Sequence, residues 1–308
     1  MSEVLIILPV YEPQLPFLNE QIKSLQSQSF WDFTCVVSYD GPKSHEFIEY
    51  LERACLDSRF ITANFDRNVG IYRHIERLLE NSSNQFKFIF LCDQDDLWDR
   101  NKVANQVTRL KSGFILVSDN ARLVDEDGNL VTNKSLFRWL AINKKSARYS
   151  LIANCATGAG TGFRREVIDF ALPFPKSLGN AFHDHWLMLV AQSLGECLLQ
   201  TSCSWSYRQH STNIVGVFSS GRSGSRFALV FAKVLEILSF QHLQSKEKDL
   251  KWLQILEFEH ELRHRDIASG NNLIRPTEYS RWPKKIVLLF PHHLFRSRLE
   301  TLRVFFSL

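Results

Sequence analysis

Hydrophobic residues gather in short unbroken runs along the first 120 positions, and the stretches between the runs carry apolar residues every three or four positions. The runs are rich in β-branched and aromatic residues, which predicts buried strands. They lie at Val4–Val10, Phe33–Gly41, Arg59–Phe65, Phe86–Asp93 and Gly113–Asn120. The intervening stretches predict helices at Leu15–Gln26, Ser44–Cys55, Ile71–Glu80 and Arg100–Lys111. Because strand and helix alternate, the pattern predicts an α/β, Rossmann-like fold with a mostly parallel sheet flanked by helices.

Polar residues stand just after the carboxyl end of every predicted strand. They are Tyr11, Glu12, Asp40, Asn68, the run Asp93–Asp96, and Asp119. In open α/β sheets the carboxyl ends of the strands form the edge where ligands bind. The pattern therefore predicts a ligand site at this edge.

The pattern changes after residue 120. Residues 123–132 predict a hairpin through Asp127-Gly128, residues 154–166 form a glycine-rich stretch leading into a helix, and residues 197–210 alternate like a strand. Helical spacing with many charges then covers residues 222–266. We expect one domain over 1–215, with halves 1–120 and 121–215, followed by a helical, basic C-terminal extension over 216–308.

The net charge of +4 is unevenly distributed, because residues 201–308 carry +7 and the first 200 residues carry −3. The six cysteines show neither a C-x-x-C pair nor zinc-ligand spacing, which indicates a reduced, cytoplasmic protein. The N-terminal run lacks a basic flank and a cleavage site, so it predicts a strand rather than a signal peptide. No apolar run reaches the ~18 residues of a membrane span.

The run Asp93-Gln94-Asp95-Asp96 places three carboxylates in four positions directly after an apolar strand. Close carboxylates repel one another and are costly to bury, so a cation is expected among them. Asp93 and Asp95 point the same way in extended backbone, and their hard oxygens suit Mg²⁺ or Mn²⁺. The alternative is a solvated acidic turn that caps the next helix.

Four motifs in a fixed order resemble the glycosyltransferase family 2 enzymes of GT-A fold. They are LPVYE after the first strand, SYDGP after the second, NVG after the third and DQDD after the fourth. The resemblance covers roughly residues 3–210 and rests on the ordered set, since each motif alone is weak.

The resemblance implies a nucleotide-sugar donor and a Mg²⁺ or Mn²⁺ cofactor, with donor-binding and metal-binding residues at the matching positions. The implied donor-binding residues are Pro9, Tyr11, Glu12, Asp40, Asn68, Gly70, Asp93, Asp95 and Arg208. The implied metal site is Asp95 with Asp93, Asp96 and His210. The alternative for Arg208 and His210 is a structural strand end.

Inverting members of the family use an aspartate at the mouth of a later helix as general base, and Asp184 in FHDHW matches it. Two alternatives remain: Asp184 as a helix cap, or His183 and His185 as part of a zinc site. The implied acceptor-binding residues are Gly160, Thr161, Gly162, His183, His185 and Trp186. An ordinary loop is the alternative for the glycine-rich stretch.

The sequence therefore predicts an inverting, metal-dependent glycosyltransferase. The stretch SYRQHSTNIVG resembles rhamnosyltransferase-like members that build bacterial surface polysaccharides of the O-antigen or capsule kind, which implies dTDP-rhamnose as donor and a saccharide or polyprenyl-linked saccharide as acceptor. The alternatives are a sugar-nucleotidyltransferase and a non-catalytic sugar-binding relative.

The tail Arg281–Leu308 carries +5 and is interleaved with large apolar residues. This composition is typical of an interfacial helix on the anionic inner face of the plasma membrane, or of a helix that packs on the domain with its basic side in water. A nucleic-acid partner is not expected.

Overall fold

The computed structural model describes residues 2–42, 44–136, 154, 156–178, 181–210 and 245–265. These residues fall into two compact units. The first unit contains every described strand and the helices up to Leu194, and the second contains helix α9 together with the short segment 175–178. The predicted domain boundaries near 120 and 215 stay predictions.

The first half of the sheet is parallel, as the alternation of strands and helices predicts. The central strand β1 pairs with β2 on one side and β4 on the other, and β3 pairs with β2. The strands are β1 (Val4–Val10), β2 (Phe33–Asp40), β3 (Phe60–Phe65) and β4 (Phe88–Leu91). All seven residues of β1 are buried, which explains why its sequence is unbroken and apolar rather than alternating.

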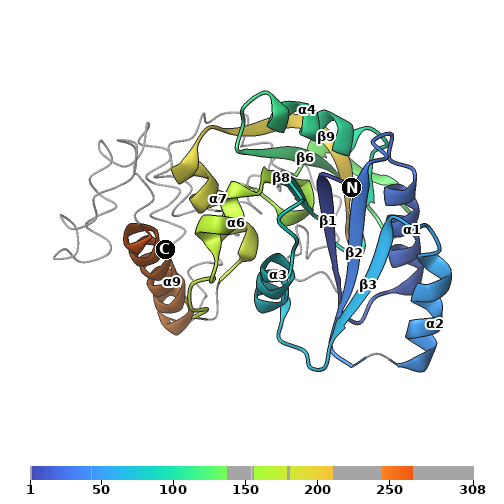
Figure 1. Cartoon of the computed structure of the whole chain (residues 1–308), viewed down its shortest axis with the longest axis horizontal. Coiled ribbons are helices and arrows are strands. Elements are labelled where there is room, and N and C mark those ends of the chain that lie inside the picture. The colour runs from blue at the N-terminus through green and yellow to red at the C-terminus, as the bar shows by residue number, and fades with distance from the viewer. Residues whose placement is uncertain are drawn as a thin grey trace, which may run out of the picture. The chain divides into compact units, whose positions relative to one another are not determined.

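Helices cover both faces of this parallel half. Helices α1 and α2 lie on one side of β1–β3 and α3 on the other (Figure 1). The helices are α1 (Leu15–Gln26), α2 (His45–Ala54), α3 (Ile71–Glu80) and α4 (Lys102–Lys111). Leu18, Ile22 and Leu25 form the buried stripe of α1, and the Ser44 hydroxyl caps α2 by accepting from Phe47 N at 3.2 Å.

The second half of the sheet departs from the expected parallel order. The short strand β8 runs antiparallel between β4 and β6, where a simple alternation predicts that the fourth and fifth strands are neighbours. Within the described residues the sheet order is β3-β2-β1-β4-β8-β6-β9-β5, with β7 paired to β6. The remaining strands are β5 (Leu97–Trp98), β6 (Leu116–Val124), β7 (Leu130–Ser135), β8 (Thr161–Arg164) and β9 (Cys197–Arg208).

Asp119 does not lie at a strand end as predicted. It falls inside β6, is 3% exposed, and accepts hydrogen bonds from the Gln200 amide and the Ser204 hydroxyl of β9. Its carboxylate therefore ties two strands together. The predicted hairpin is confirmed, since β6 and β7 are antiparallel and Gly128 between them has a φ of +83°.

Two helices of the first unit pack closely against each other. These are α6 (Glu166–Ala171) and α7 (His183–Leu194). The Trp186 indole N–H on α7 donates to the Ala171 carbonyl at 2.9 Å, and residues 185–191 are all buried. Helix α7 is therefore a core helix whose middle is apolar and whose polar groups lie in its first and last turns.

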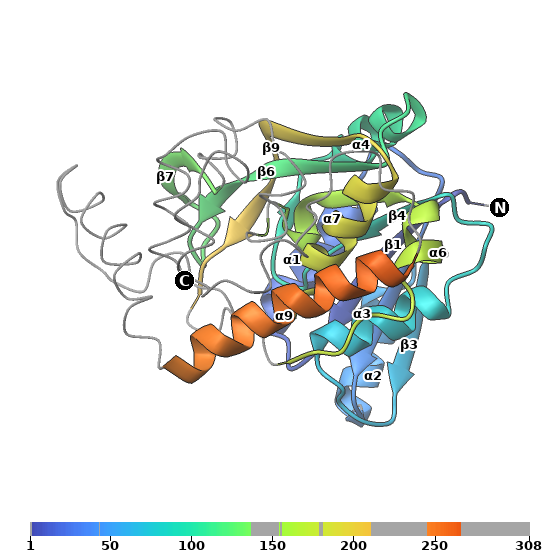
Figure 2. The same ribbon diagram turned by 90° about the vertical axis from the view of Figure 1, so that its left-hand side faces the viewer.

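Helix α9 (Ser245–His264) belongs to the second unit and is the long orange helix in Figure 2. Its Gln254 side chain accepts from Leu178 N at 2.6 Å and donates to Lys176 O at 3.0 Å. The helix confirms part of the spacing over 222–266, and the tail Arg281–Leu308 lies outside the described residues. Across the described part of the chain, we find no helix with the length and apolarity that a membrane crossing requires.

Candidate active site

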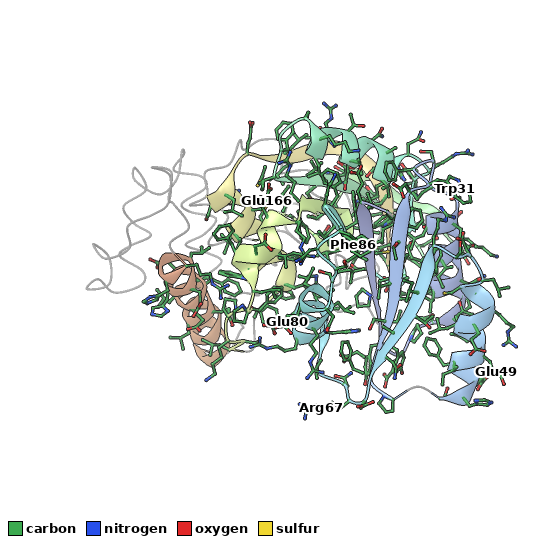
Figure 3. The ribbon with its side chains drawn as sticks, viewed as in Figure 1. Trp31, Glu49, Arg67, Glu80, Phe86 and Glu166 are labelled. Atoms are coloured by element: carbon green, nitrogen blue, oxygen red, sulfur yellow. The ribbon has the colours of Figure 1, made fainter. Side chains whose placement is uncertain are left out.

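The acidic run follows β4 and forms a loop before β5, at the edge where the parallel strands end. Figure 3 marks the two ends of the sheet with Trp31, which precedes β2, and Arg67, which follows β3. Asp93 and Asp95 are half-buried, whereas Asp96 is fully buried. The three carboxylates therefore differ in their access to a ligand.

A buried arginine lies beneath the acidic run. The backbone N–H of Arg208 donates to Asp96 Oδ1 at 3.2 Å, and its Nε donates to the Asp95 carbonyl at 3.1 Å. The guanidinium lies over the Phe17 ring at 4.5 Å and forms an ion pair with Glu20 of α1. Arg208 is 1% exposed, so it holds the loop from beneath instead of reaching a donor as the sequence implied.

A second, buried cation lies behind the loop. Lys102 begins α4, is 0% exposed, and its Nζ lies 3.8 Å from the centroid of the Trp98 ring. Its Nζ has no hydrogen-bond partner in the described structure, and burial lowers its pKa to about 8. Asp119 and Asp96 oppose this shift, so the ammonium adds positive potential behind the acidic run.

Asp95 pairs with His210, whose side chain is 4% exposed while that of Asp95 is 20% exposed. The distance between Asp95 Oδ2 and His210 Nε2 is 2.9 Å, and the imidazole packs against the Phe17 ring at 5.3 Å between centroids. The predicted metal ligands Asp95 and His210 are thus brought together, although they are 115 positions apart.

Asp93 faces the first turn of α7. Burial, then repulsion from Asp95 and Asp184, raise the pKa of Asp93 to about 7. The Asp184 carboxylate accepts from Gly158 N at 3.1 Å and from His185 N at 2.8 Å. The predicted base is therefore fixed by backbone N–H groups and interacts electrostatically with the acidic loop, and Phe182 rather than Asp184 is the cap residue of α7.

The predicted nucleotide pocket has a rigid frame. Asp40 accepts from Val69 N and Gly70 N, both at 2.9 Å, and Asn68 Oδ1 also accepts from Gly70 N. Gly70 needs its φ of +78°, a conformation that L-residues rarely adopt. The Asp40 carboxylate is 2% exposed, so in this structure it holds the turn after β3 in place.

Sequence reasoning missed the role of Gln94, the middle residue of the acidic motif. Its side-chain amide accepts from Tyr11 N at 3.0 Å and donates to Tyr11 O at 3.1 Å, which joins the loops after β1 and β4. Tyr11 is 46% exposed and its ring lies 6.4 Å from that of Tyr39, while Glu12 has a φ of +41°. In the sequence, the one signal for Gln94 was its place within the motif DQDD.

Several predicted site residues pack inside the fold instead of lining open space. Pro9 lies buried in β1 opposite Ser38, and Trp186 is fully buried in the core. A Cβ on Gly160 would come within 2.7 Å of the Asp119 carbonyl, and one on Gly162 within 2.6 Å of the Phe90 ring. These glycines allow close strand packing, which corrects their predicted acceptor contacts.

Thr161 and His185, also expected at the acceptor, are buried as well. The Thr161 hydroxyl donates to Thr157 O at 2.6 Å, and His185 is 8% exposed. His183 remains at the mouth of α7, where burial lowers its pKa and its Nδ1 has no hydrogen-bond partner in the described structure. A Cβ on Gly158 would come within 2.9 Å of the His183 ring, so the two residues are in close contact. Of the two histidines that flank Asp184, His183 is the one whose side chain is only half-buried.

The described residues contain no cluster of three His, Cys, Asp or Glu side chains arranged for a metal ion, so the alternative zinc site with His183 and His185 finds no support there. The Asp95–His210 pair nevertheless fits a divalent ion that takes its other ligands from a substrate diphosphate and water. Asp96 is excluded as a ligand in this arrangement, because it is fully buried and held by Arg208 N.

Comparisons with known proteins identify the family and the fold. The family described as Glycosyl transferase family 2 matches residues 5–170. No curated protein matches this chain by sequence. The solved S. aureus TarS 1–349 in complex with UDP is 15% identical over 68% of this chain, with a TM-score of 0.50, and the chain spans 61% of that TarS chain.

The complex of TarS 1–349 with UDP-GlcNAc gives 13% identity over 90% of this chain and 78% of that one, with a TM-score of 0.51. At these identities the likeness shows the fold alone. The predicted fold class, an α/β architecture of GT-A type, is therefore confirmed.

Proposed function

The chain belongs to glycosyl transferase family 2, and from that premise we propose that it is an inverting, metal-dependent enzyme that transfers a sugar from a nucleotide donor to a saccharide acceptor. The observation that carries the proposal is the pairing of Asp95 in the acidic loop with His210 at 2.9 Å, beside a second carboxylate, Asp184, that two backbone N–H groups hold at the mouth of α7. The first pair belongs to the donor side of the proposed site and Asp184 to the acceptor side.

The donor is a nucleoside-diphosphate sugar. Family membership supports this class, and so does the fold shared with TarS, whose solved complexes contain UDP and UDP-GlcNAc. The exposed ring of Tyr11 offers a stacking surface for a nucleobase, and Asn68 lies at the adjoining turn. The sequence resemblance favours dTDP-rhamnose, so a test has to offer both thymidine and uridine donors.

Asp95 and His210 would hold the Mg²⁺ or Mn²⁺ ion, with the Asp93 carboxylate beside them. When bound, the ion supplies positive charge that neutralises the nucleoside diphosphate as it leaves. Arg208 keeps the loop in position through its hydrogen bonds to Asp95 and Asp96, and Lys102 adds positive potential behind it. Both residues are buried, so neither offers its charge to open space. The chain's own contribution on this side is therefore to hold two ligands at a fixed separation.

Asp184 acts on the acceptor. Two backbone N–H groups orient its carboxylate, and its remaining lone pairs accept the proton of the attacking hydroxyl. The hydroxyl oxygen then bonds to the anomeric carbon on the face opposite the diphosphate, so the configuration inverts. A general base of this kind typically contributes ~10²–10⁴-fold to the rate.

The test is a panel of nucleotide sugars, including dTDP-rhamnose and UDP-GlcNAc, incubated with Mn²⁺ and the full chain while released nucleoside diphosphate is measured. We expect slow release from one donor and its loss in Asp95→Ala. Asp184→Asn should still bind that donor but lose transfer to an acceptor by at least ~10²-fold. Asp169→Asn, an exposed carboxylate on α6, is the matched control and should behave as the wild type.

Consumption of a nucleoside triphosphate would identify a nucleotidyltransferase and overturn the proposal. Donor binding without any release would identify a sugar-binding relative. The polyprenyl-linked acceptor and the membrane contact through residues 281–308 rest on the sequence alone. Co-sedimentation with anionic vesicles, compared between the full chain and a chain ending at residue 280, tests the membrane contact.

A further inference from the structure

Helix α9 carries a histidine pair that the proposed reaction does not use. The segment His260-Glu261-Leu262-Arg263-His264 places the two histidines four residues apart, on the same face of the helix. Their Nε2 atoms are 2.9 Å apart and their ring centroids 4.2 Å apart, and both side chains are exposed. Two nitrogen ligands therefore converge at the surface of the second unit.

We propose that His260 and His264 form a binding site for a borderline transition-metal dication, with Zn²⁺ as the representative ion. Neutral imidazole is a common ligand of such ions, at a Zn–N distance of about 2.0–2.1 Å. Two nitrogens at tetrahedral positions on one ion lie about 3.3 Å apart. The observed separation of 2.9 Å between the two Nε2 atoms is about 0.4 Å shorter than this. Small rotations of the two exposed side chains can increase it by that amount without any movement of the helix.

The segment has the spacing H-E-x-x-H, but it lacks the other parts of a metallopeptidase centre. In such enzymes the glutamate activates a water on the metal, and a third protein ligand completes the site. Here the Glu261 carboxylate accepts from Arg265 at 3.0 and 3.3 Å, and the described residues bring no third ligand to the pair. The site therefore binds an exchangeable metal whose other positions are filled by water.

The two proposed metal sites of this chain differ in their ligands. The pair on α9 offers two imidazole nitrogens, which suit Zn²⁺, Ni²⁺ and Cu²⁺, whereas the proposed site at the acidic loop combines the His210 imidazole with the Asp95 carboxylate, whose oxygen suits Mg²⁺ and Mn²⁺. Excess Mg²⁺ therefore competes with Zn²⁺ at Asp95 and not at the histidine pair, and Asp95→Ala distinguishes the two sites. Because the pair converges only while this turn of α9 is helical, the metal also stabilises the helix.

The first experiment titrates the full chain with Zn²⁺ in excess Mg²⁺ at neutral pH and follows binding by calorimetry. We expect one equivalent to be lost, or weakened by about tenfold or more, in His260→Ala and in His264→Ala. His45→Ala is the matched control, because His45 is also exposed on a helix and has Glu49, a carboxylate, four residues on, at 3.3 Å. Its Zn²⁺ binding should equal that of the wild type.

Asp95→Ala separates this site from the proposed active site and should keep the equivalent. The electron paramagnetic resonance spectrum of a Cu²⁺-loaded sample should show hyperfine splitting from two nitrogens. Zn²⁺ should slow hydrogen exchange of the α9 amides in the wild type but not in the variant that carries both His260→Ala and His264→Ala. Unchanged Zn²⁺ binding in both single variants would overturn the proposal. So would loss of the equivalent in Asp95→Ala, or no binding by the wild type.

Discussion

Replacing Lys102 with methionine should stabilise the protein, although it removes a side chain that is completely buried. Burial lowers the lysine pKa from 10.5 to about 8, a shift of about 2.5 units. At 1.36 kcal/mol per unit, the charged form costs the folded state about 3.4 kcal/mol at pH 7. The contact of Nζ with the Trp98 ring offsets up to about 2 kcal/mol of this cost. Methionine fills a similar volume, so the free energy of unfolding should rise by about 1–3 kcal/mol.

The pH dependence gives the sharper test. The unfolded chain keeps the Lys102 proton up to pH ~10.4, whereas the folded chain releases it near pH 8. Wild-type stability should therefore rise relative to Lys102→Met as the pH increases between these values. Urea unfolding of both proteins at several pH values from 7 to 10.5 measures the difference.

A matched control is Lys111→Met on the same helix, where the lysine is exposed and paired with Glu3. It should lose no more than about 1 kcal/mol. The reasoning about Lys102 is refuted if Lys102→Met is less stable than the wild type at pH 7, or if the difference between the two proteins is the same at pH 7 and pH 10.5.

Three further changes probe the frame of the site. Arg208→Met removes the hydrogen bonds of the buried guanidinium to Asp95 O and Glu126 O and should lower the free energy of unfolding by about 3 kcal/mol in urea titration. A loss below about 1 kcal/mol would contradict its supporting role. Gly70→Ala forces a side chain into a φ of +78° and should lower the free energy of unfolding by about 1 kcal/mol. Donor binding, followed by thermal shift, should also weaken, because the turn that Asp40 holds is disturbed. An unchanged melting temperature together with an unchanged donor affinity would argue against this. Burial lowers the pKa of His74, so on acidification the unfolded chain is protonated at this histidine before the folded chain. The stability of the wild type should therefore fall, relative to that of His74→Gln, as the pH drops below about 6.5. Parallel curves of unfolding free energy against pH for the two proteins would count against it.

The alternation of strands and helices predicted the parallel half of the sheet, because the apolar runs of β1 and β4 are strands buried on both faces and the runs of β2 and β3 pair beside them. It could not predict β8, since the four residues Thr161–Arg164 carry little hydrophobic signal and include a glycine. Their strand conformation comes from pairing with β4 and β6, which are distant in sequence. The same tertiary pairing extended β6 past Asp119 and moved that residue from the predicted edge into the interior.

For the site, strand ends and motif order located the acidic loop in the sequence, and the resemblance of the stretch SYRQHSTNIVG implied His210, which pairs with Asp95 in the structure. The sequence did not distinguish residues that face a ligand from residues that support them. Arg208 and Trp186 are functional residue types in suitable places, yet both are buried. Burial depends on the packing of several elements together, which residue type and spacing do not encode.

The pairing of Gln94 with the backbone of Tyr11 has a consequence for recognising such chains. A primary amide presents a donor and an acceptor in one plane, so it can satisfy a main-chain N–H and C=O at once, as another strand would. Glutamate, which is acceptor-only when ionised, would leave the carbonyl without a donor, and methionine would leave both groups poorly satisfied. A sequence pattern that allows any residue between Asp93 and Asp95 therefore does not distinguish chains in which this side chain can join the loop after β1 to the loop after β4.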